Sequence, residues 1–110
     1  VIPYVGDVSD PASCDGMIEA AVRSFGRLDV LVNNAGIMDD NTAVGDVSNE
    51  MIERLFRVNT YGPLYAMRKA VQVFLAQGED SGNMNLRESQ SHGIMLSCKR
   101  RQEKPLIACL

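Results

Sequence analysis

The stretch LDVLVNNAG at residues 28–36 decides the fold. Residues 28–32 form a short run with apolar side chains on both faces, which is typical of a strand buried between helix layers. The run ends at Asn33-Asn34-Ala35-Gly36, and ligands bind outside the carboxyl ends of strands in open α/β sheets. Small residues leave the backbone accessible to a ring or sugar, and the asparagines offer amide donors and acceptors. A plain turn, with Asn and Gly at positive φ, is the alternative.

The residues before this stretch predict a strand and a helix. Val1 to Val5 is mostly apolar and stops at Gly6-Asp7, which indicates a short buried strand. Asp10 is a suitable N-cap, Pro11 suits the first helical position, and Gly26 suits the end of the helix. One helical face carries apolar residues, namely Met17, Ile18, Ala21, Val22 and Phe25. Strand, helix and strand in about 35 residues form a βαβ unit, whose strands are parallel neighbours.

A second, longer helix is expected from Ser48, with Val47 and Ile52 at the positions of a hydrophobic staple. Gly62-Pro63 should kink it. Two apolar stripes lie on either side of the kink: Met51, Ile52, Leu55 and Phe56 before it, and Leu64, Met67, Val71, Phe74 and Leu75 after it.

Asn59 lies inside this helix, where Asn is a poor helix former. Pro63 stands four residues later and has no N–H, so it cannot bond the Asn59 carbonyl. That carbonyl is free for a water or another donor, since a buried carbonyl needs a partner. A harmless kink is the alternative.

Gly6-Asp7-Val8 repeats the polar strand end one strand earlier. The Asp7 carboxylate could accept a hydrogen bond from a nucleobase amine, or it could simply belong to a turn that leads into the helix.

These segments together resemble the short-chain dehydrogenase/reductase family. The resemblance rests on Gly6-Asp7-Val8, on residues 26–36 and on Val58-Asn59, and it covers about residues 1–78. It implies an α/β fold, namely a partial Rossmann-like parallel sheet of two to three strands with two main helices. It also implies an NAD(P)-dependent oxidoreductase that transfers hydride between a nicotinamide and a small-molecule alcohol or carbonyl substrate. The chain looks like the central segment of such an enzyme, truncated at both ends.

The resemblance also assigns site residues. Asn59 is the catalytic asparagine, whose backbone carbonyl holds a relay water. The cofactor-binding positions are Asp7 at the adenine amine, Val8 at the base, Asn34, Ala35 and Gly36 at the ribose, and Val58 near the cofactor. The cofactor is NAD or NADP.

Two parts of the family pattern are missing, so whether the chain is an enzyme stays open. No Gly-rich phosphate loop precedes Asp7, and no Tyr-x-x-x-Lys follows the strand-like run at residues 94–98. Tyr65 and Lys69 fit that spacing, but they lie on the same helix as Asn59, so we expect them to be ordinary helix residues. We therefore expect the fragment to be inactive alone. The alternatives are a non-catalytic interaction module that pairs with a full-length relative or with itself through helix 48–77, and an unrelated nucleotide or flavin binder.

The periodicity fades after Gly78, so residues 1–78 are expected to be the Rossmann-like segment and residues 79–110 an atypical tail. Within the tail, Gly93–Ser97 could form one short strand, a charge run at 98–104 should be solvated, and the end should be disordered. His92 has no spacing that suggests a metal or catalytic role.

The composition narrows the class of partner. The chain has 110 residues, 45% apolar and 23% charged, with a formal net charge of −3, which is ordinary for a small globular domain. There is no basic block for nucleic acid or a membrane surface, and no long apolar run. Cys14, Cys98 and Cys109 form no metal or disulfide pattern, which fits a reducing, cytoplasmic location. No metal site is expected.

Overall fold

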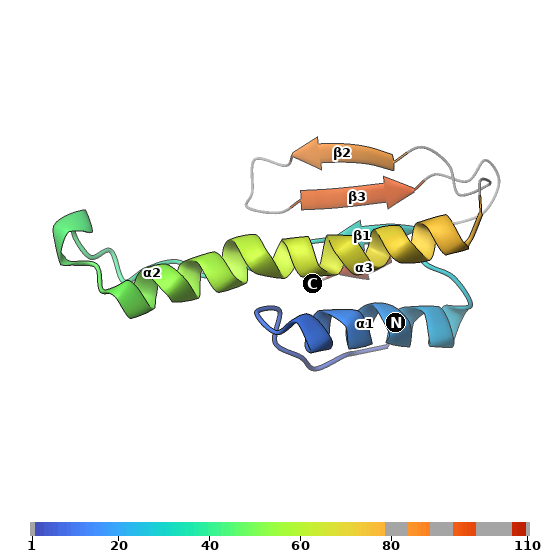
Figure 1. The fold of residues 1–110 in the computed structure, drawn as a ribbon, viewed down its shortest axis with the longest axis horizontal. Coiled ribbons are helices and arrows are strands. Elements are labelled where there is room, and N and C mark those ends of the chain that lie inside the picture. Colours follow the sequence, from blue (N-terminus) through green and yellow to red (C-terminus); the bar gives the residue numbers. More distant parts are fainter. Residues whose placement is uncertain (1, 79–83, 89–93, 99–106, 110) are drawn as a thin grey trace.

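The computed structural model describes residues 2–78, with side chains, and the backbone of three short strands further along the chain. The elements up to residue 78 are α1 (Pro11–Phe25), β1 (Val30–Val32), a 3₁₀ turn η1 (Val44–Asp46), α2 (Asn49–Phe56), a π-helical segment η2 (Arg57–Tyr61) and α3 (Gly62–Ala76). The three later strands are β2 (Met84–Glu88), β3 (Ile94–Cys98) and β4 (Ile107–Cys109). Figure 1 shows α2, η2 and α3 as one long helix, with α1 alongside its α3 half and α2 extending beyond α1.

Helix α1 begins and ends where its sequence signals predict. The Asp10 side chain accepts a hydrogen bond from the Ser13 N–H, and Pro11 occupies the first turn. Gly26 caps the other end at a φ of 78°, and its N–H donates to the Val22 carbonyl. Both predicted boundaries of this helix are confirmed.

The long helix also begins as predicted. Ser48 is its N-cap and accepts a hydrogen bond from the Met51 N–H at 3.1 Å. The expected irregularity before Pro63 takes the form of the π-helical segment η2, in which the Gly62 N–H donates to the Arg57 carbonyl five residues back. The helix continues as α3 after this segment, so the two main helices of the prediction are present.

The core lies where α1, α3 and β1 meet. Its fully buried members include Ile18 of α1, Leu31 of β1 and Ala66 and Ala70 of α3. The buried face of α3 consists of Gly62, Ala66, Ala70 and Phe74, which are spaced four residues apart. Three of these residues are small, so α3 can approach α1 and β1 closely.

This small-residue face corrects the predicted apolar stripes. Leu64 and Leu75, expected on the inner face of the helix, are 52% and 75% exposed. In α2 no residue is buried, and Ile52 and Phe56 are about half-exposed. Phe25 of α1 is likewise exposed by 42%. In α3 the sequence favoured the two leucines as core residues, but the close approach of the helices leaves room for alanines there instead.

The predicted parallel sheet is wrong in two respects. Residues 2–6 form no strand, and Val5 is 98% exposed. The sheet order is β2-β3-β1-β4, so both edges of β1 are taken by β3 and β4 and none is left for residues 2–6. The sheet is also mixed, because β1 pairs parallel to β4 but antiparallel to β3, and β2 pairs antiparallel to β3.

The predictions for residues 79–110 fall only partly on described residues. A strand, β3, lies where Gly93–Ser97 was expected to form one. His92 and most of the charge run at 98–104 lie outside the described residues.

Candidate functional site

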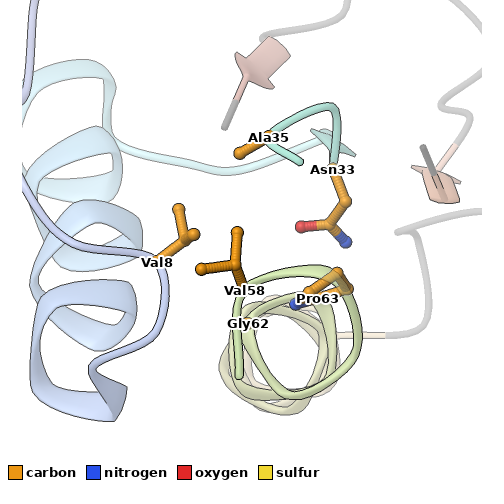
Figure 2. Close-up of a pocket in the computed structure, with 6 residues that line it drawn as sticks. All are labelled: Val8, Asn33, Ala35, Val58, Gly62 and Pro63. Atoms are coloured by element: carbon orange, nitrogen blue, oxygen red, sulfur yellow. The ribbon is translucent and has the colours of Figure 1, made fainter. Parts of the chain in front are cut away.

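Three segments that are far apart in the sequence meet at one small hollow beside the amino end of α3. Its lining comes from the turn before α1 (Val8), from the end of β1 (Asn33 and Ala35) and from the long helix (Val58, Gly62 and Pro63). The empty volume is about 160 Å³, including the solvent at its mouth. Figure 2 shows the Val8 and Val58 side chains near one another, with the Asn33 amide above Pro63. The hollow is largely apolar with one amide at its edge.

Gly62 allows the turn at Val8 to approach the long helix. A Cβ placed on Gly62 would lie 2.8 Å from the Val8 carbonyl oxygen and 3.3 Å from its carbonyl carbon. Real Cβ atoms essentially never come so close to a backbone oxygen, so only glycine fits without a shift. From the sequence, Gly62 was expected only to form part of a kink. The signal for its role was a glycine within a helix, which costs about 1 kcal/mol and needs a packing reason.

The Asn59 side chain ties the long helix to the loop after β1. Its Nδ2 donates to the Ile37 carbonyl at 2.8 Å, and its Oδ1 accepts from the Ile37 N–H at 2.9 Å. Gly36 lies next to this pair, since a Cβ on it would be 3.4 Å from Asn59 Oδ1. The two halves of one amide therefore hold a loop backbone in place.

Pro63 removes the α-helical donor of the Asn59 carbonyl. Pro63 is four residues after Asn59 and five after Val58, and it has no N–H for the α-helical or the π-helical register. The Gly62 N–H, the α-helical partner of the Val58 carbonyl, bonds Arg57 instead. The π-helical segment thus leaves the Val58 carbonyl without its α-helical donor as well.

Asn33, at the edge of the hollow, is a buried amide. The residue is 2% exposed, and neither Nδ2 nor Oδ1 has a hydrogen-bond partner within the described part of the chain. A buried amide without partners costs free energy, so such a group marks a place where a partner is expected. Asn33 belongs to the asparagine pair of the sequence motif but was not among the predicted cofactor contacts.

Asp7 lies in the turn that leads to Val8 and α1. Its Oδ1 accepts hydrogen bonds from the Ser9 N–H and the Ser9 hydroxyl, both at 2.8 Å, and its own N–H donates to Ser13 Oγ at 2.9 Å. The backbone bond from Ser9, followed by the hydroxyl bond, holds the pKa of this exposed carboxyl below its usual value. Asp7 therefore stays ionised and can accept a further hydrogen bond from solvent or a ligand.

The remaining predicted site residues separate into two groups. Ala35 and Val58 line the hollow together with Val8, whereas Asn34 and Gly36 are exposed and lie outside its lining. The geometry brings the three segments of the prediction together, and the functional role of each residue stays a prediction.

Tyr65 and Lys69 are engaged in packing between helices. Lys69 Nζ lies 2.6 Å from Glu19 Oε1 across the α1–α3 contact, and this bond raises the pKa of Lys69 and lowers that of Glu19. The Tyr65 ring packs against the core and lies under the Arg68 guanidinium at 5.5 Å. The ammonium thus serves a carboxylate instead of the phenol.

Among the described residues, no group of three His, Cys, Asp or Glu side chains is placed to hold a metal ion. No helix among them has the length and apolar character to cross a membrane.

Comparison with known families gives a match over most of the chain. The sequence profile of a family described as enoyl-(acyl carrier protein) reductase matches residues 1–95. Among curated relatives, 3beta-hydroxysteroid dehydrogenase 2 of Eggerthella lenta is 42% identical over 73 residues, which is 66% of this chain and 28% of the relative. L-Rhamnose 1-dehydrogenase (NAD(P)(+)) of Sphingomonas sp. is 37% identical over 77 residues, which is 70% of this chain and 30% of the relative.

Solved structures agree with the sequence matches. The structure described as ElxO with NADP bound superimposes with a TM-score of 0.56 at 33% identity, covering 60% of this chain and 27% of that one. A short chain dehydrogenase from Burkholderia cenocepacia J2315 in complex with NADP gives 0.57 at 28% identity, covering 62% and 27%. This chain spans less than a third of the length of each of these four relatives.

Proposed function

Because the chain belongs to the short-chain dehydrogenase/reductase family, we propose that residues 2–78 form one wall of an NAD(P) crevice. The whole protein would be an oxidoreductase that transfers hydride between the nicotinamide and a small-molecule alcohol or carbonyl carbon. The observation that carries this proposal is the meeting of Val8, Ala35 and Val58, from three separate segments, at one hollow. A Rossmann-like α/β fold goes with this function, and the shared core of β1, α1 and α3 is in keeping with it.

The hollow accounts for only part of a dinucleotide site. Its empty volume of about 160 Å³ counts the open solvent at its mouth and leaves no enclosed room for a ring, whereas sites for drug-sized ligands usually enclose roughly 300–1,000 Å³. Its apolar lining can therefore offer a surface to one flat ring or a ribose face, and the Asn33 amide, which has no partner among the described residues, supplies a donor and an acceptor beside it. These residues would contact one section of NAD(P), and other parts of the whole protein would hold the rest.

Each residue of the wall has a proposed part. Asp7 remains ionised and would accept a hydrogen bond from the adenine amine, and Val8 would pack on the base. The exposed backbone at Asn34, Ala35 and Gly36 would approach the ribose, and Val58 would close the hollow from the helix side. The comparisons support NAD(P) as the cofactor, since both solved relatives described above carry NADP.

When bound, the nicotinamide supplies the hydride donor or acceptor. Asn59 is the residue of this chain that we place nearest the reaction. Its side chain is occupied by Ile37, so its contribution comes from the backbone carbonyl, which has no N–H at Pro63 to bond. That carbonyl would hold a water through which a proton moves to solvent.

A binding experiment tests the proposal without any need for turnover. Saturation-transfer NMR on NADP+ with the chain should show weak contact, with a dissociation constant near 1 mM, equivalent to about 4 kcal/mol. Ala35→Leu should fill the hollow and remove most of the signal. Ala76→Leu, on an exposed position near the end of α3, is the matched control and should retain it. Equal signals from both variants, or no signal from the unmodified chain, would reject the proposal.

We expect no turnover by this chain alone. The family's chemistry needs an acid/base group near the substrate, and Lys69, the one lysine described with its side chain, is paired with Glu19 away from the hollow. Nicotinamide absorbance with a panel of alcohols and ketones should stay at the uncatalysed rate. A clear rate above it would overturn this expectation.

The exposed apolar residues of the long helix favour a second candidate role. Ile52, Phe56 and Leu64 of the long helix are each about half-exposed. We propose that this surface pairs with a second copy or a full-length relative. Sedimentation of the chain with Phe56→Glu should give a smaller species than the unmodified chain, and identical species would reject pairing through this surface.

We further propose a reducing, cytoplasmic location, which the free, buried Cys14 supports.

A further inference from the structure

A second side-chain amide holds the other end of β1 in the same way as Asn59 holds Ile37. Gln77, just after α3, accepts from the Leu28 N–H at 2.7 Å and donates from Nε2 to the Leu28 carbonyl at 2.8 Å. Leu28 is almost fully buried, so its backbone N–H and carbonyl cannot bond to water. The Gln77 amide satisfies both of them instead. Each amide thus imitates a neighbouring strand, pairing the N–H and the C=O of one residue.

The two pairs enclose β1 between them. Leu28 precedes the strand and Ile37 follows it, while Asn59 lies within η2 and Gln77 directly after α3. Eighteen residues separate the amides along the helix, or roughly 27 Å at about 1.5 Å each. Nine residues separate their backbone partners, and only Val30–Val32 of this stretch is a strand, so roughly 30 Å, at about 3.3 Å each, is the longest span that it can reach. That upper limit is close to the length along the helix, so the stretch has little slack between the two pairs.

This match gives the pairs a joint effect on register. A slip of the helix by one strand residue, about 3.3 Å, would break all four hydrogen bonds at once. With one pair released, the helix could tilt or slide, and the other pair would hold only a local contact. Without such a joint effect, the two pairs would be expected to act independently, because substitutions at sites more than about 10 Å apart usually have additive effects on stability.

We propose that Gln77 is a positioning residue, which sets the register of the long helix on β1 and thereby holds Asn59 and Val58 opposite the loop at Ala35. The part of this proposal that concerns a cofactor crevice rests on the proposed function. The coupling between the two amide pairs does not rest on it, so the coupling can be tested separately.

Amide NMR and hydrogen exchange on the full chain test this proposal. Gln77→Met keeps the length of the side chain and removes both bonds, whereas Gln77→Glu keeps the acceptor and removes the donor. Both should shift the Ile37 amide and the Asn59 side-chain NH₂ signals and speed exchange of the Ile37 N–H by at least about fivefold, with the larger effect for Met. Gln72→Met, on the exposed side of α3, is the matched control and should leave those signals unchanged.

The reverse direction supplies the decisive outcome. Asn59→Leu should speed exchange of the Leu28 N–H, because a coupling between two sites is reciprocal. If changes at Gln77 affect only Leu28, and changes at Asn59 only Ile37, the pairs are independent anchors and the proposal is overturned. Should a variant not fold, exchange in the unmodified chain decides: the Leu28 and Ile37 N–H groups should show the same dependence on low urea, and different dependences would count against coupling.

Discussion

Gly62→Ala tests most sharply how closely the long helix approaches the turn at Val8. The new Cβ would stand 2.8 Å from the Val8 carbonyl oxygen, so either backbone must shift by about 0.6 Å to restore an ordinary contact near 3.4 Å. Overpacking of this kind costs about 1–3 kcal/mol. Gly62 has ordinary helical backbone angles, φ −52° and ψ −57°, so alanine also gains up to about 1 kcal/mol of helix propensity. The net expectation is a loss of about 1 kcal/mol.

Urea unfolding measures this loss. With an m value of about 2 kcal/mol/M, a loss of 1 kcal/mol lowers the midpoint by about 0.5 M. Gly45→Ala is the matched control, because a Cβ there meets nothing within 4 Å, and its midpoint should stay or rise. An equal gain in both variants would show that α3 does not pack against Val8 as described, and the geometry of the hollow would have to be abandoned.

The ionisable groups provide two further predictions. Ser9→Ala removes one of the two bonds to the Asp7 carboxylate, so the pKa of Asp7 should rise toward its usual value of 3.8 in an NMR titration. Because the pKa of Asp7 is lower in the folded state, its carboxylate stabilises the fold above the unfolded pKa, and this effect is lost as the pH falls through the folded-state pKa. The Ser9→Ala variant should therefore lose less stability in acid. An unchanged Asp7 titration would contradict the assignment. Glu19→Gln should lower the pKa of Lys69, whose raised value stabilises the fold at pH values below 10.5 and ceases to do so as pH rises through it. A Lys69 titration that does not move would show that the α1–α3 ion pair does not form in solution.

Local signals in the sequence predicted the helices well. Asp10, Gly26 and Ser48 each act on a backbone group within a few residues, so their effects do not depend on the rest of the fold. The same holds for Pro63, whose missing N–H is a property of one residue.

The errors concern contacts between distant segments. Whether residues 2–6 form a strand depends on a free edge beside β1, and no local pattern reveals that both edges are occupied. The buried face of α3 was misjudged for a related reason. Hydrophobicity favours Leu64 and Leu75, but the distance between packed helices decides which side chains fit, and it selects Ala66 and Ala70.

In the candidate site, local features could be predicted from the sequence, whereas contacts between distant segments could not. The polar strand end at Asn33-Asn34 and the irregular helix at Asn59 could be recognised from residue types and spacing. The pairing of Asn59 with Ile37, 22 residues away, could not, since either end alone looks like a surface amide and a loop backbone. Gln77 and Leu28, 49 residues apart, were missed for the same reason.

Chemical-shift mapping of NADP+ on the isotopically labelled chain tests the central claim most directly. If the turn at residue 8, the end of β1 and the π-helical segment form one wall of a cofactor crevice, the amides of Val8, Ala35 and Val58 should shift together, along one saturation curve. Shifts confined to α1 or to the outer surface of α2, or none at 10 mM NADP+, would contradict it.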